Sequence, residues 1–390
     1  MTDSQPASAG PKVPAGLYLK TRVFEATRPL WRQLARLESA VLRDELREIP
    51  IREPIYIAGV ARSGTTILTE MLSRHPDVTS HRYSDFPNIY TPYWRNWLAQ
   101  RVRRSTPPAV ERAHRDRVMV TPESPEAVEE VIWMAHFDGL HDASRSQILG
   151  PEARNEAFER HYLDHIRKLL LVRGRSRYLT KGNYNVSRVG YIRKLFPDAR
   201  ILVPIRSPIS HVASLVKQDR LFTRAAGADS RVVKQLHRSG HFEFGPDKRC
   251  IHTGDDRTAG QIQADWADGN SVAAWARYWA SVHECILDFC KSSTANRDSV
   301  LFVPYEELCN RSAEVIDRVI GHCRLPAEKF GEVRDEYADR LAEPGYYSIE
   351  FDTHEARCIE EICGPVAARL GYAIACSEVG TPSHLEQVTR

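Results

Sequence analysis

Residues 59–66 (GVARSGTT) combine small residues with one arginine and several hydroxyl groups. They follow a short apolar run, residues 54–60, and lead into residues 65–72, where apolar side chains recur with helical spacing. At a junction of this kind, backbone N–H groups and the positive end of the helix can bind a phosphate group. The segment therefore predicts a phosphate-binding loop.

This loop departs from the loops of nucleotide triphosphate hydrolases. Gly59 and Gly64 have the spacing G-x-x-x-x-G, but Thr65 stands where those loops have a lysine. Arg62 is the cation inside the loop, and a guanidinium group can form paired contacts with phosphate or sulfate oxygens. The sequence therefore argues against an ATP or GTP hydrolase. The alternative to a phosphate-binding loop is a tight turn in which the serine and the threonines only cap the helix.

The elements around the loop alternate between strand and helix. Apolar runs without polar alternation predict strands at residues 54–60, 177–181, 199–205 and 300–303, each followed by a segment with helical periodicity. Such strands indicate a parallel sheet that is covered on both faces. We expect an α/β fold: a three-layer parallel sheet with helices on both faces, a P-loop-like phosphate-binding loop and helical insertions.

Three segments resemble the sulfotransferases that use 3′-phosphoadenosine 5′-phosphosulfate (PAPS). They are GVARSGTTILTEMLSRHPDV (59–78), YLTKGNYNVSRVGYIRKLFPDARILVPIRSPISHVASLV (178–216) and VLFVPYEEL (300–308). Together they cover the α/β core of the chain. The resemblance is to bacterial-type members of the family, and in particular to the tyrosylprotein and glycan sulfotransferase branch.

The resemblance implies that the loop binds the 5′-phosphosulfate of PAPS. No metal is implied, and PAP is the desulfated product. The loop residues that match the family's motif are Arg62, Ser63, Gly64, Thr65 and Thr66.

Two further motifs carry roles in the same family. An arginine at a strand end and a serine eight residues later bind the 3′-phosphate, which corresponds to Arg206 and Ser214 here. A strand-end lysine contacts the bridging oxygen of the leaving group, which corresponds to Lys181 in YLTK. The resemblance therefore implies that Lys181 and Arg62 are catalytic.

The general base is the point where the sequence departs from this branch. The family's glutamate, about twenty residues beyond the loop arginine, has no counterpart in residues 80–87. Asp85 is the nearest carboxylate, and His81 is the alternative because histidine ordinarily titrates near neutral pH. Asp85 can instead form a turn before Phe86-Pro87. We expect the base to be Asp85 or His81, with Glu130 next.

Residues 121–137 (TPESPEAVEEVIWMAHF) bring several glutamates together. A hydroxyl residue followed by acids and an early proline is typical of a helix start, so capping explains most of these acids. The alternative is that Glu130 and Trp133 face an acceptor pocket.

We expect a single sulfotransferase α/β domain over residues 17–376, with a disordered N-terminal tail (1–16) and a C-terminal tail (377–390). An arginine-rich insertion near 88–125 indicates either solvated helices or an anion-binding surface. An insertion near 225–270 has the length of a functional lid.

Apolar residues from Leu17 to Leu46 recur with helical spacing and a break at Pro29. This pattern predicts helices that cover the core.

Composition narrows the class of protein. A net charge of +3 is too small to argue for a nucleic-acid partner, and no apolar run reaches the ~20 residues of a membrane span. The N-terminus lacks the features of a signal peptide, which predicts a cytoplasmic protein. The cysteines form no CxxC pair, which argues against a zinc site.

The leading hypothesis is transfer of a sulfuryl group from PAPS to a hydroxyl of a carbohydrate, glycolipid or small metabolite. A nucleotide-dependent kinase on a P-loop fold is the alternative enzyme, although Thr65 argues against it. A third hypothesis is a catalytically silent nucleotide-binding protein, which the missing glutamate favours. The oligomeric state is left open.

Overall fold

A computed structural model of the chain describes residues 13–102, 108–112, 119–342 and 351–372. The expected C-terminal tail and residues 1–12 of the expected N-terminal tail lie outside the described residues, while residues 15 and 16 already belong to the first helix.

Among the described residues, five parallel strands form the central sheet in the order β2-β5-β1-β6-β7. The four predicted strands are confirmed, and β2 is an additional strand that the sequence pattern missed. The strands are β1 (Ile55–Ile57), β2 (Val78–Thr79), β5 (Arg177–Lys181), β6 (Arg200–Ile205) and β7 (Val300–Pro304).

The strand order places a crevice beside the phosphate loop. β1 lies in the middle of the sheet. The strands β5 and β2 lie on one side of β1 and the strands β6 and β7 lie on the other, so the strand order reverses at β1. Ligands of open α/β sheets bind at the carboxyl ends of the strands where the order reverses in this way. The loops after β1, β5 and β6 therefore meet at one edge of the sheet.

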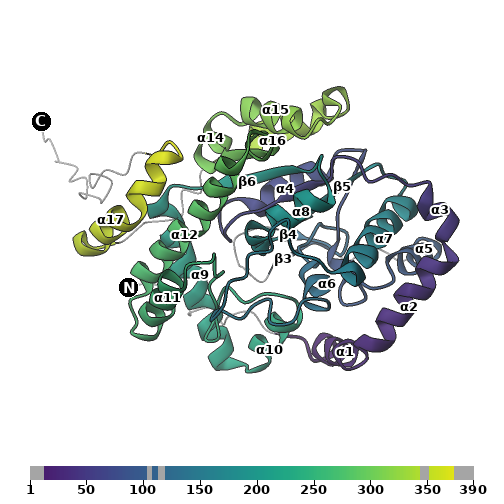
Figure 1. Cartoon of the computed structure of the whole chain (residues 1–390), viewed down its shortest axis with the longest axis horizontal. Coiled ribbons are helices and arrows are strands. Elements are labelled where there is room, and N and C mark those ends of the chain that lie inside the picture. The colour runs from purple at the N-terminus through teal and green to yellow at the C-terminus, as the bar shows by residue number, and fades with distance from the viewer. Residues whose placement is uncertain (1–12, 103–107, 113–118, 343–350, 373–390) are drawn as a thin grey trace, which may run out of the picture.

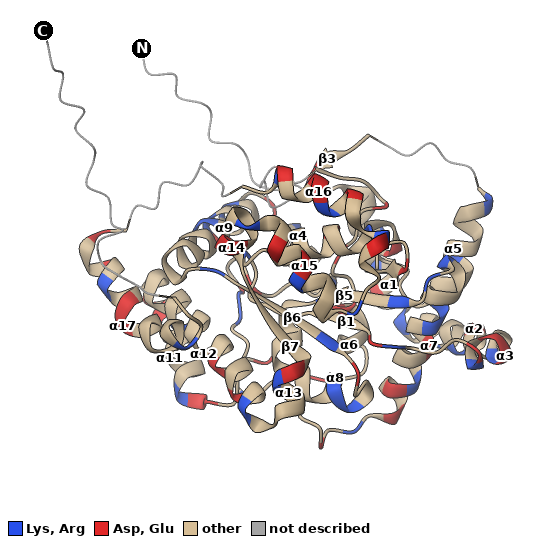
Figure 2. Cartoon of the chain, turned by 90° about the horizontal axis from the view of Figure 1, so that it is seen from above, with Lys and Arg blue, Asp and Glu red and all other residues tan. Residues whose placement is uncertain are grey.

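Two hydrophobic clusters cover the two faces of the sheet. Along β1, Ile55 and Ile57 belong to one cluster and Tyr56 to the other, because successive side chains of a strand point to opposite faces. Figure 2 shows the strands between α4 and α15 on one side and α8 on the other. This confirms the α/β fold with helices on both faces. The cluster that contains Ile55 and Ile57 includes residues of α4 (Thr65–Ser73) and α15 (Ser312–His322). The cluster that contains Tyr56 includes residues of α7 (Glu156–Arg173), α8 (Val189–Leu195), α9 (Pro208–Ala228) and α12 (Ser271–Ser292).

The N-terminal helices form, but their apolar stripe does not cover the core as predicted. Leu37 and Val41 of α2 are 54% and 61% exposed, and the inward side of that helix carries Ala35 and Glu38 instead. Figure 1 shows these helices at one side of the molecule, beside α5 and α7. They are α1 (Ala15–Ala26), α2 (Arg28–Val41) and α3 (Arg43–Arg47).

Both insertions contain more regular structure than their compositions indicate. The first holds α5 (Pro92–Arg101) and an antiparallel pair, β3 (Val110–Glu111) and β4 (Met119–Val120). The second is largely helical, with α10 (Arg231–Arg238) and α11 (Asp256–Ala267). Both reach the carboxyl edge of the sheet, where Arg112 and His241 line the same pocket.

The other described helices complete the domain. Within the described ranges, none combines the length and the apolar character needed to cross a bilayer. They are α6 (Glu130–Met134), α13 (Thr294–Ser299), α14 (Tyr305–Asn310), α16 (Gly331–Arg340), α17 (Thr353–Arg369) and the 3₁₀ turns η1 (Tyr83–Asp85), η2 (Asn183–Ser187) and η3 (Ala327–Lys329).

Candidate active site

The loop between β1 and α4 has the backbone of an anion cradle. Arg62 and Gly64 have φ angles of 74° and 101°, both in the left-handed region. A Cβ atom on Gly64 would lie 2.8 Å from the ring of Tyr305, so only glycine fits this position. Left-handed residues in such a turn direct backbone N–H groups to one side, which favours a bound anion. For Arg62 the conformation is costly, and costly backbone conformations concentrate at functional sites.

Two cations from distant parts of the chain meet the first turn of α4. Lys181, at the end of β5, has its Nζ atom 3.2 Å from the Thr66 Oγ1 atom. An Nη1 atom of Arg112, from the first insertion, donates to the same hydroxyl at 2.9 Å. The parallel pairing of Ile57 with Lys181 brings the lysine to the loop, because the strand ends are in register. The loop and the YLTK motif therefore share one site.

A second contact joins the loop to the RSPISHVAS segment. The Arg62 Nε atom donates to Ser214 Oγ at 3.2 Å, and Ser214 is buried on α9. His211, also on α9, has its Nε2 atom 2.8 Å from the Ala61 carbonyl oxygen. Arg206 follows β6, and its guanidinium lies 5.1 Å from the centre of the Tyr305 ring. Tyr305 thus contacts Arg206 and also limits the space at Gly64.

The third sequence block, VPYEEL, supports this arrangement. Glu306 accepts a hydrogen bond from the Ser207 backbone N–H at 2.9 Å and from the Tyr372 hydroxyl at 2.7 Å. The Ser207 N–H lies at the start of α9, where a carboxylate also interacts favourably with the helix dipole. Glu306 thereby helps to hold the segment that carries Arg206 and Ser214.

A pocket opens beside Lys181 and the loop. The motifs predicted Arg62, Thr65, Thr66 and Lys181 but missed much of the remaining wall, because no family motif falls on those segments. The pocket is lined by Ala61, Arg62, Thr65, Thr66, Arg112, Glu126, Ala127, Lys181, Asn183, Phe222, Leu236, His241, Glu243 and Phe244.

Among the residues that the structure describes, Glu126 is the carboxylate that pairs with the strand-end lysine. Its Oε1 atom lies 3.7 Å from Lys181 Nζ. Burial alone would raise the pKa of Glu126, but the positive charge of Lys181 and a hydrogen bond from Tyr83 outweigh burial and hold the pKa at about 2. The carboxylate is therefore ionised at neutral pH, and its low pKa makes it a weaker base than an ordinary glutamate. Its sequence context indicated only a capping role.

Asp85 and His81, the predicted bases, lie in a different environment. Asp85 is buried, with its carboxylate 2.6 Å from Arg95 Nη1 and 2.7 Å from Arg173 Nη2. Burial would raise the pKa of this carboxyl, but the nearby His81 ring, whose Nδ1 atom lies 3.8 Å from Asp85 Oδ2, and the charge of Arg173 hold it far below its usual range. His81 lies against His165, with their Nε2 atoms 3.2 Å apart.

Neither residue lines the pocket at the loop. The structure thus does not bring Asp85 and His81 to Lys181 and Arg62. The aspartate that we expected at the acceptor instead closes a buried ion pair between η1, α5 and α7. Its placement does not support a role as the base, since a base must reach the proton that it removes.

Glu130 and Trp133 also face inward. Arg188 forms two hydrogen bonds to Glu130, at 2.7 and 2.8 Å, and His141 lies 2.7 Å from the same carboxylate. Burial opposes ionisation of Glu130, but Arg188 and His141 hold its pKa at about 2. Trp133 is fully buried in the core. Glu130 is therefore placed as a structural counter-ion, and Trp133 does not form an acceptor wall.

In the described part of the chain, no three or more His, Cys, Asp or Glu side chains are grouped as metal ligands.

Comparisons with known proteins concern the family and the fold of this chain. Residues 54–243 match the model of the sulfotransferase family. A solved structure, the sulfotransferase STF9 from Mycobacterium avium, is similar at a TM-score of 0.50 and 12% identity, over 87% of this chain and 82% of that chain. The sulfotransferase STF1 from Mycobacterium tuberculosis H37Rv aligns at a TM-score of 0.49 and 12% identity, over 93% of this chain and 88% of that chain. A search of the curated proteins gave no match.

The likeness to the first of these structures concerns the fold. The family match spans the segment from β1 to Glu243, and it includes the phosphate loop, Lys181, Arg206 and Ser214. Residues 54–243 of this chain, just under half of its length, therefore match the sulfotransferase family.

Proposed function

We propose that this protein transfers a sulfuryl group from PAPS to a hydroxyl group of a carbohydrate, glycolipid or small metabolite. The observation that carries the proposal is the meeting of Arg62, Thr66 and Lys181 at the carboxyl ends of β1 and β5. Sulfuryl transfer requires cations around the transferred group, and this edge of the sheet supplies them.

The residues at the loop fit the two charged ends of PAPS. The left-handed backbone at Arg62 and Gly64 and the start of α4 suit the 5′-phosphosulfate, because backbone N–H groups and the helix end favour an anion there. Arg206 and Ser214 suit the 3′-phosphate. The hydrogen bond from Arg62 to Ser214 supports neighbouring positions for the two phosphate groups.

Each catalytic role follows from charge and position. Lys181, beside Thr66, would stabilise negative charge that develops on the leaving oxygen, and Arg62 would hold the sulfuryl group in place. Glu126 would take the proton of the acceptor hydroxyl, because it is ionised and lies 3.7 Å from Lys181. This assignment replaces the earlier expectation of Asp85 or His81.

The remaining wall of the pocket suits a hydroxyl-rich acceptor. Asn183 Nδ2 donates to Glu243 Oε1 at 2.6 Å, and these polar groups lie near His241. The rings of Phe222 and Phe244 stack with their centres 6.0 Å apart on the same wall. Polar groups beside aromatic surfaces are typical of sites that bind ligands of mixed polarity, such as sugars.

The direct test is turnover with labelled PAPS and a panel of acceptors: sugars, glycolipids and phenolic or aliphatic alcohols. We expect label to move to at least one hydroxyl acceptor and PAP to accumulate in equal amount. Lys181→Ala is the matched background control. Phosphoryl transfer from ATP to the same acceptors, without transfer from PAPS, would instead support a kinase.

A further inference from the structure

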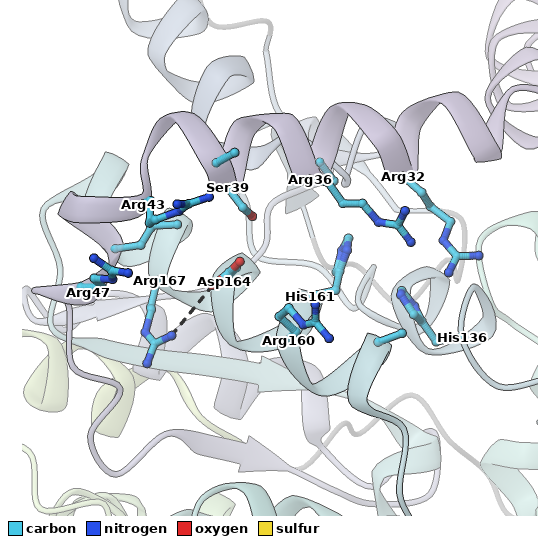
Figure 3. Close-up of a pocket in the computed structure, with 14 residues that line it drawn as sticks. Arg32, Arg36, Ser39, Arg43, Arg47, His136, Arg160, His161, Asp164 and Arg167 are labelled. Carbon is cyan, nitrogen blue, oxygen red and sulfur yellow. Dashed lines mark ion pairs between the residues drawn. The ribbon is translucent and has the colours of Figure 1, made fainter.

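A second strongly basic cavity lies between α2 and α7, away from the phosphate loop. Its volume is about 540 Å³, and six arginines and two histidines line it against one carboxylate, Asp164. It shares no lining residue with the pocket at Lys181. Figure 3 shows Arg32, Arg36, Arg160, His136 and His161 at one end. The other end holds Arg43, Arg47 and Arg167.

Four of these six arginines have no counter-ion among the residues that the structure describes. They are Arg32, Arg36, Arg43 and Arg160, whereas Arg47 lies 3.4 Å from Asp44. Arg167 has Asp164 only at 3.9 Å. Like charges that converge without partners repel one another, and an anion between them would relieve the repulsion.

The helix α2, which carries Arg32 and Arg36, is held firmly on α7. Lys168 Nζ lies 3.1 Å from Glu38 Oε2, and both side chains are almost fully buried. The same ammonium donates to the Ala35 carbonyl oxygen at 2.9 Å. Glu38 also accepts from the Trp94 N–H at 2.7 Å. The guanidinium groups of α2 therefore project from a backbone that is fixed relative to Arg160 and Arg167.

His161 adds a buried, unpartnered ring nitrogen to the lining of the same cavity, because its Nε2 atom has no hydrogen-bond partner among the residues that the structure describes. Burial is the main cause that lowers the pKa of His161 to about 3, and the nearby charges of His136, Lys168, Arg32 and Arg36 lower it further. The pKa of His136 is also lowered, by burial and then by Arg32 and Arg36. An anion in the cavity would oppose these positive charges.

We propose that the cavity between α2 and α7 binds a ligand with at least two phosphate or sulfate groups, at a site separate from the phosphate loop. Guanidinium groups make strong charge-assisted contacts with such groups, and the two arginine clusters can each hold one. The ligand could be a free polyphosphate or the phosphorylated headgroup of a lipid, because both present the same chemistry. This site is built partly by α2, which precedes the segment matched by the family model.

Calorimetric titration of the full chain with inorganic tripolyphosphate tests the site. Arg36→Ala/Arg160→Ala should weaken binding by about 100-fold or more, since each lost charge-assisted contact is worth roughly tenfold or more. Arg357→Ala removes one positive charge from an exposed position on α17 and should bind like wild type. Arg62→Ala changes the loop pocket and not the cavity, so tripolyphosphate binding that persists in this variant takes place at the cavity.

Imidazole resonances of the unmodified protein give a second readout that does not depend on folding of a variant. Saturation with tripolyphosphate should raise the pKa of His161 and His136, and Arg357→Ala should show the same rise. Co-sedimentation with vesicles that contain phosphatidylinositol 4-phosphate, whose headgroup carries two phosphate groups, compared with vesicles of phosphatidylcholine alone, distinguishes the two sources. If binding to the phosphatidylinositol 4-phosphate vesicles depends on Arg36 and Arg160, the ligand is a lipid headgroup. If these vesicles do not bind while tripolyphosphate does, the ligand is a free polyphosphate.

The proposal is overturned if Arg36→Ala/Arg160→Ala binds tripolyphosphate and vesicles as tightly as wild type. It is equally overturned if Arg62→Ala alone abolishes binding and the histidine resonances do not move. In that case the phosphate loop is the binding site. Neither result bears on sulfuryl transfer at Lys181, which is measured separately with PAPS.

Discussion

Lys181 Nζ lies 3.2 Å from the hydroxyl oxygen of Thr66, although the two residues are 115 positions apart in the chain. The contact joins the end of β5 to the first turn of α4, because β1 and β5 run parallel and in register. A cation and a hydroxyl are thereby placed next to the backbone of the phosphate loop. The account of function depends on this relationship.

Lys181→Ala should lower kcat by ~10²-fold or more while PAP affinity changes little. The reason is that a cation at the leaving oxygen gains most as charge develops in the transition state. Steady-state kinetics with PAPS and calorimetry with PAP measure the two quantities. Lys291→Ala, an exposed lysine on α12, is the control. A normal kcat with weakened PAP binding would make Lys181 a binding residue only.

Arg206→Ala should weaken PAP far more than adenosine 5′-phosphosulfate, which lacks the 3′-phosphate. The lost charge-assisted hydrogen bond is worth ~1.5–3 kcal/mol. The comparison of two ligands on one variant is its own control, since a folding defect would affect both. Equal losses for both ligands would show that Arg206 does not bind the 3′-phosphate.

Glu126→Gln should reduce kcat/KM by ~10²–10⁴-fold, the range for loss of a general base. Because the pKa of Glu126 is held at about 2, the carboxylate stays ionised at every higher pH. The wild-type kcat/KM should therefore not fall between pH 7 and pH 5 through protonation of the base. Glu123→Gln, in the same segment but half exposed, is the control.

A fall in kcat/KM below ~pH 6.5 would instead indicate a histidine base. Full activity of Glu126→Gln, combined with inactivity of His241→Ala, would move the role to His241. Activity of both variants would exclude this wall of the pocket as the source of the base.

Asp85→Asn should destabilise the fold by ~3–5 kcal/mol at pH 7, because it leaves Arg173 buried without its counter-ion. The pKa of Asp85 is lowered in the folded state. The contribution of Asp85 to the free energy of unfolding is therefore present above the ordinary carboxyl pKa of ~3.9 and is lost as the pH falls below that value. Denaturant unfolding at pH 7 and at pH 3 measures this dependence. Asp298→Asn, an exposed aspartate, should leave stability unchanged. Normal stability with abolished turnover would return Asp85 to a catalytic role.

The strands and the loop were predictable because their signals are local. Apolar runs identified β1, β5, β6 and β7, and small residues between a strand and a helix identified the loop. The stripe on α2 was misread, because hydropathy identifies an apolar face but not its partner. The inward side of α2 depends on the Glu38–Lys168 ion pair, which joins residues 130 positions apart and has no hydropathy signal.

The base illustrates the limit of spacing arguments. A fixed distance from the loop arginine pointed to Asp85, but Arg95 and Arg173 draw that side chain into the interior. Glu126 lies at the end of an insertion, and it reaches Lys181 only through the tertiary fold. The helix-start pattern of residues 121–137 explained Glu126 as a capping residue. Nothing in the sequence therefore distinguished Glu126 from the neighbouring glutamates.

The central claim is that the loop pocket is a PAPS site, and calorimetric titration of the full chain with PAP and with ATP tests it most directly. Arg62 contacts Ser214, Arg206 lies over the Tyr305 ring that limits the space at Gly64, and Thr65 replaces the lysine of triphosphate loops. We therefore expect PAP to bind at least tenfold more tightly than ATP, a difference of about 1.4 kcal/mol, and Arg206→Ala to remove that preference. Equal or tighter binding of ATP, unaffected by Arg206→Ala, would contradict the account.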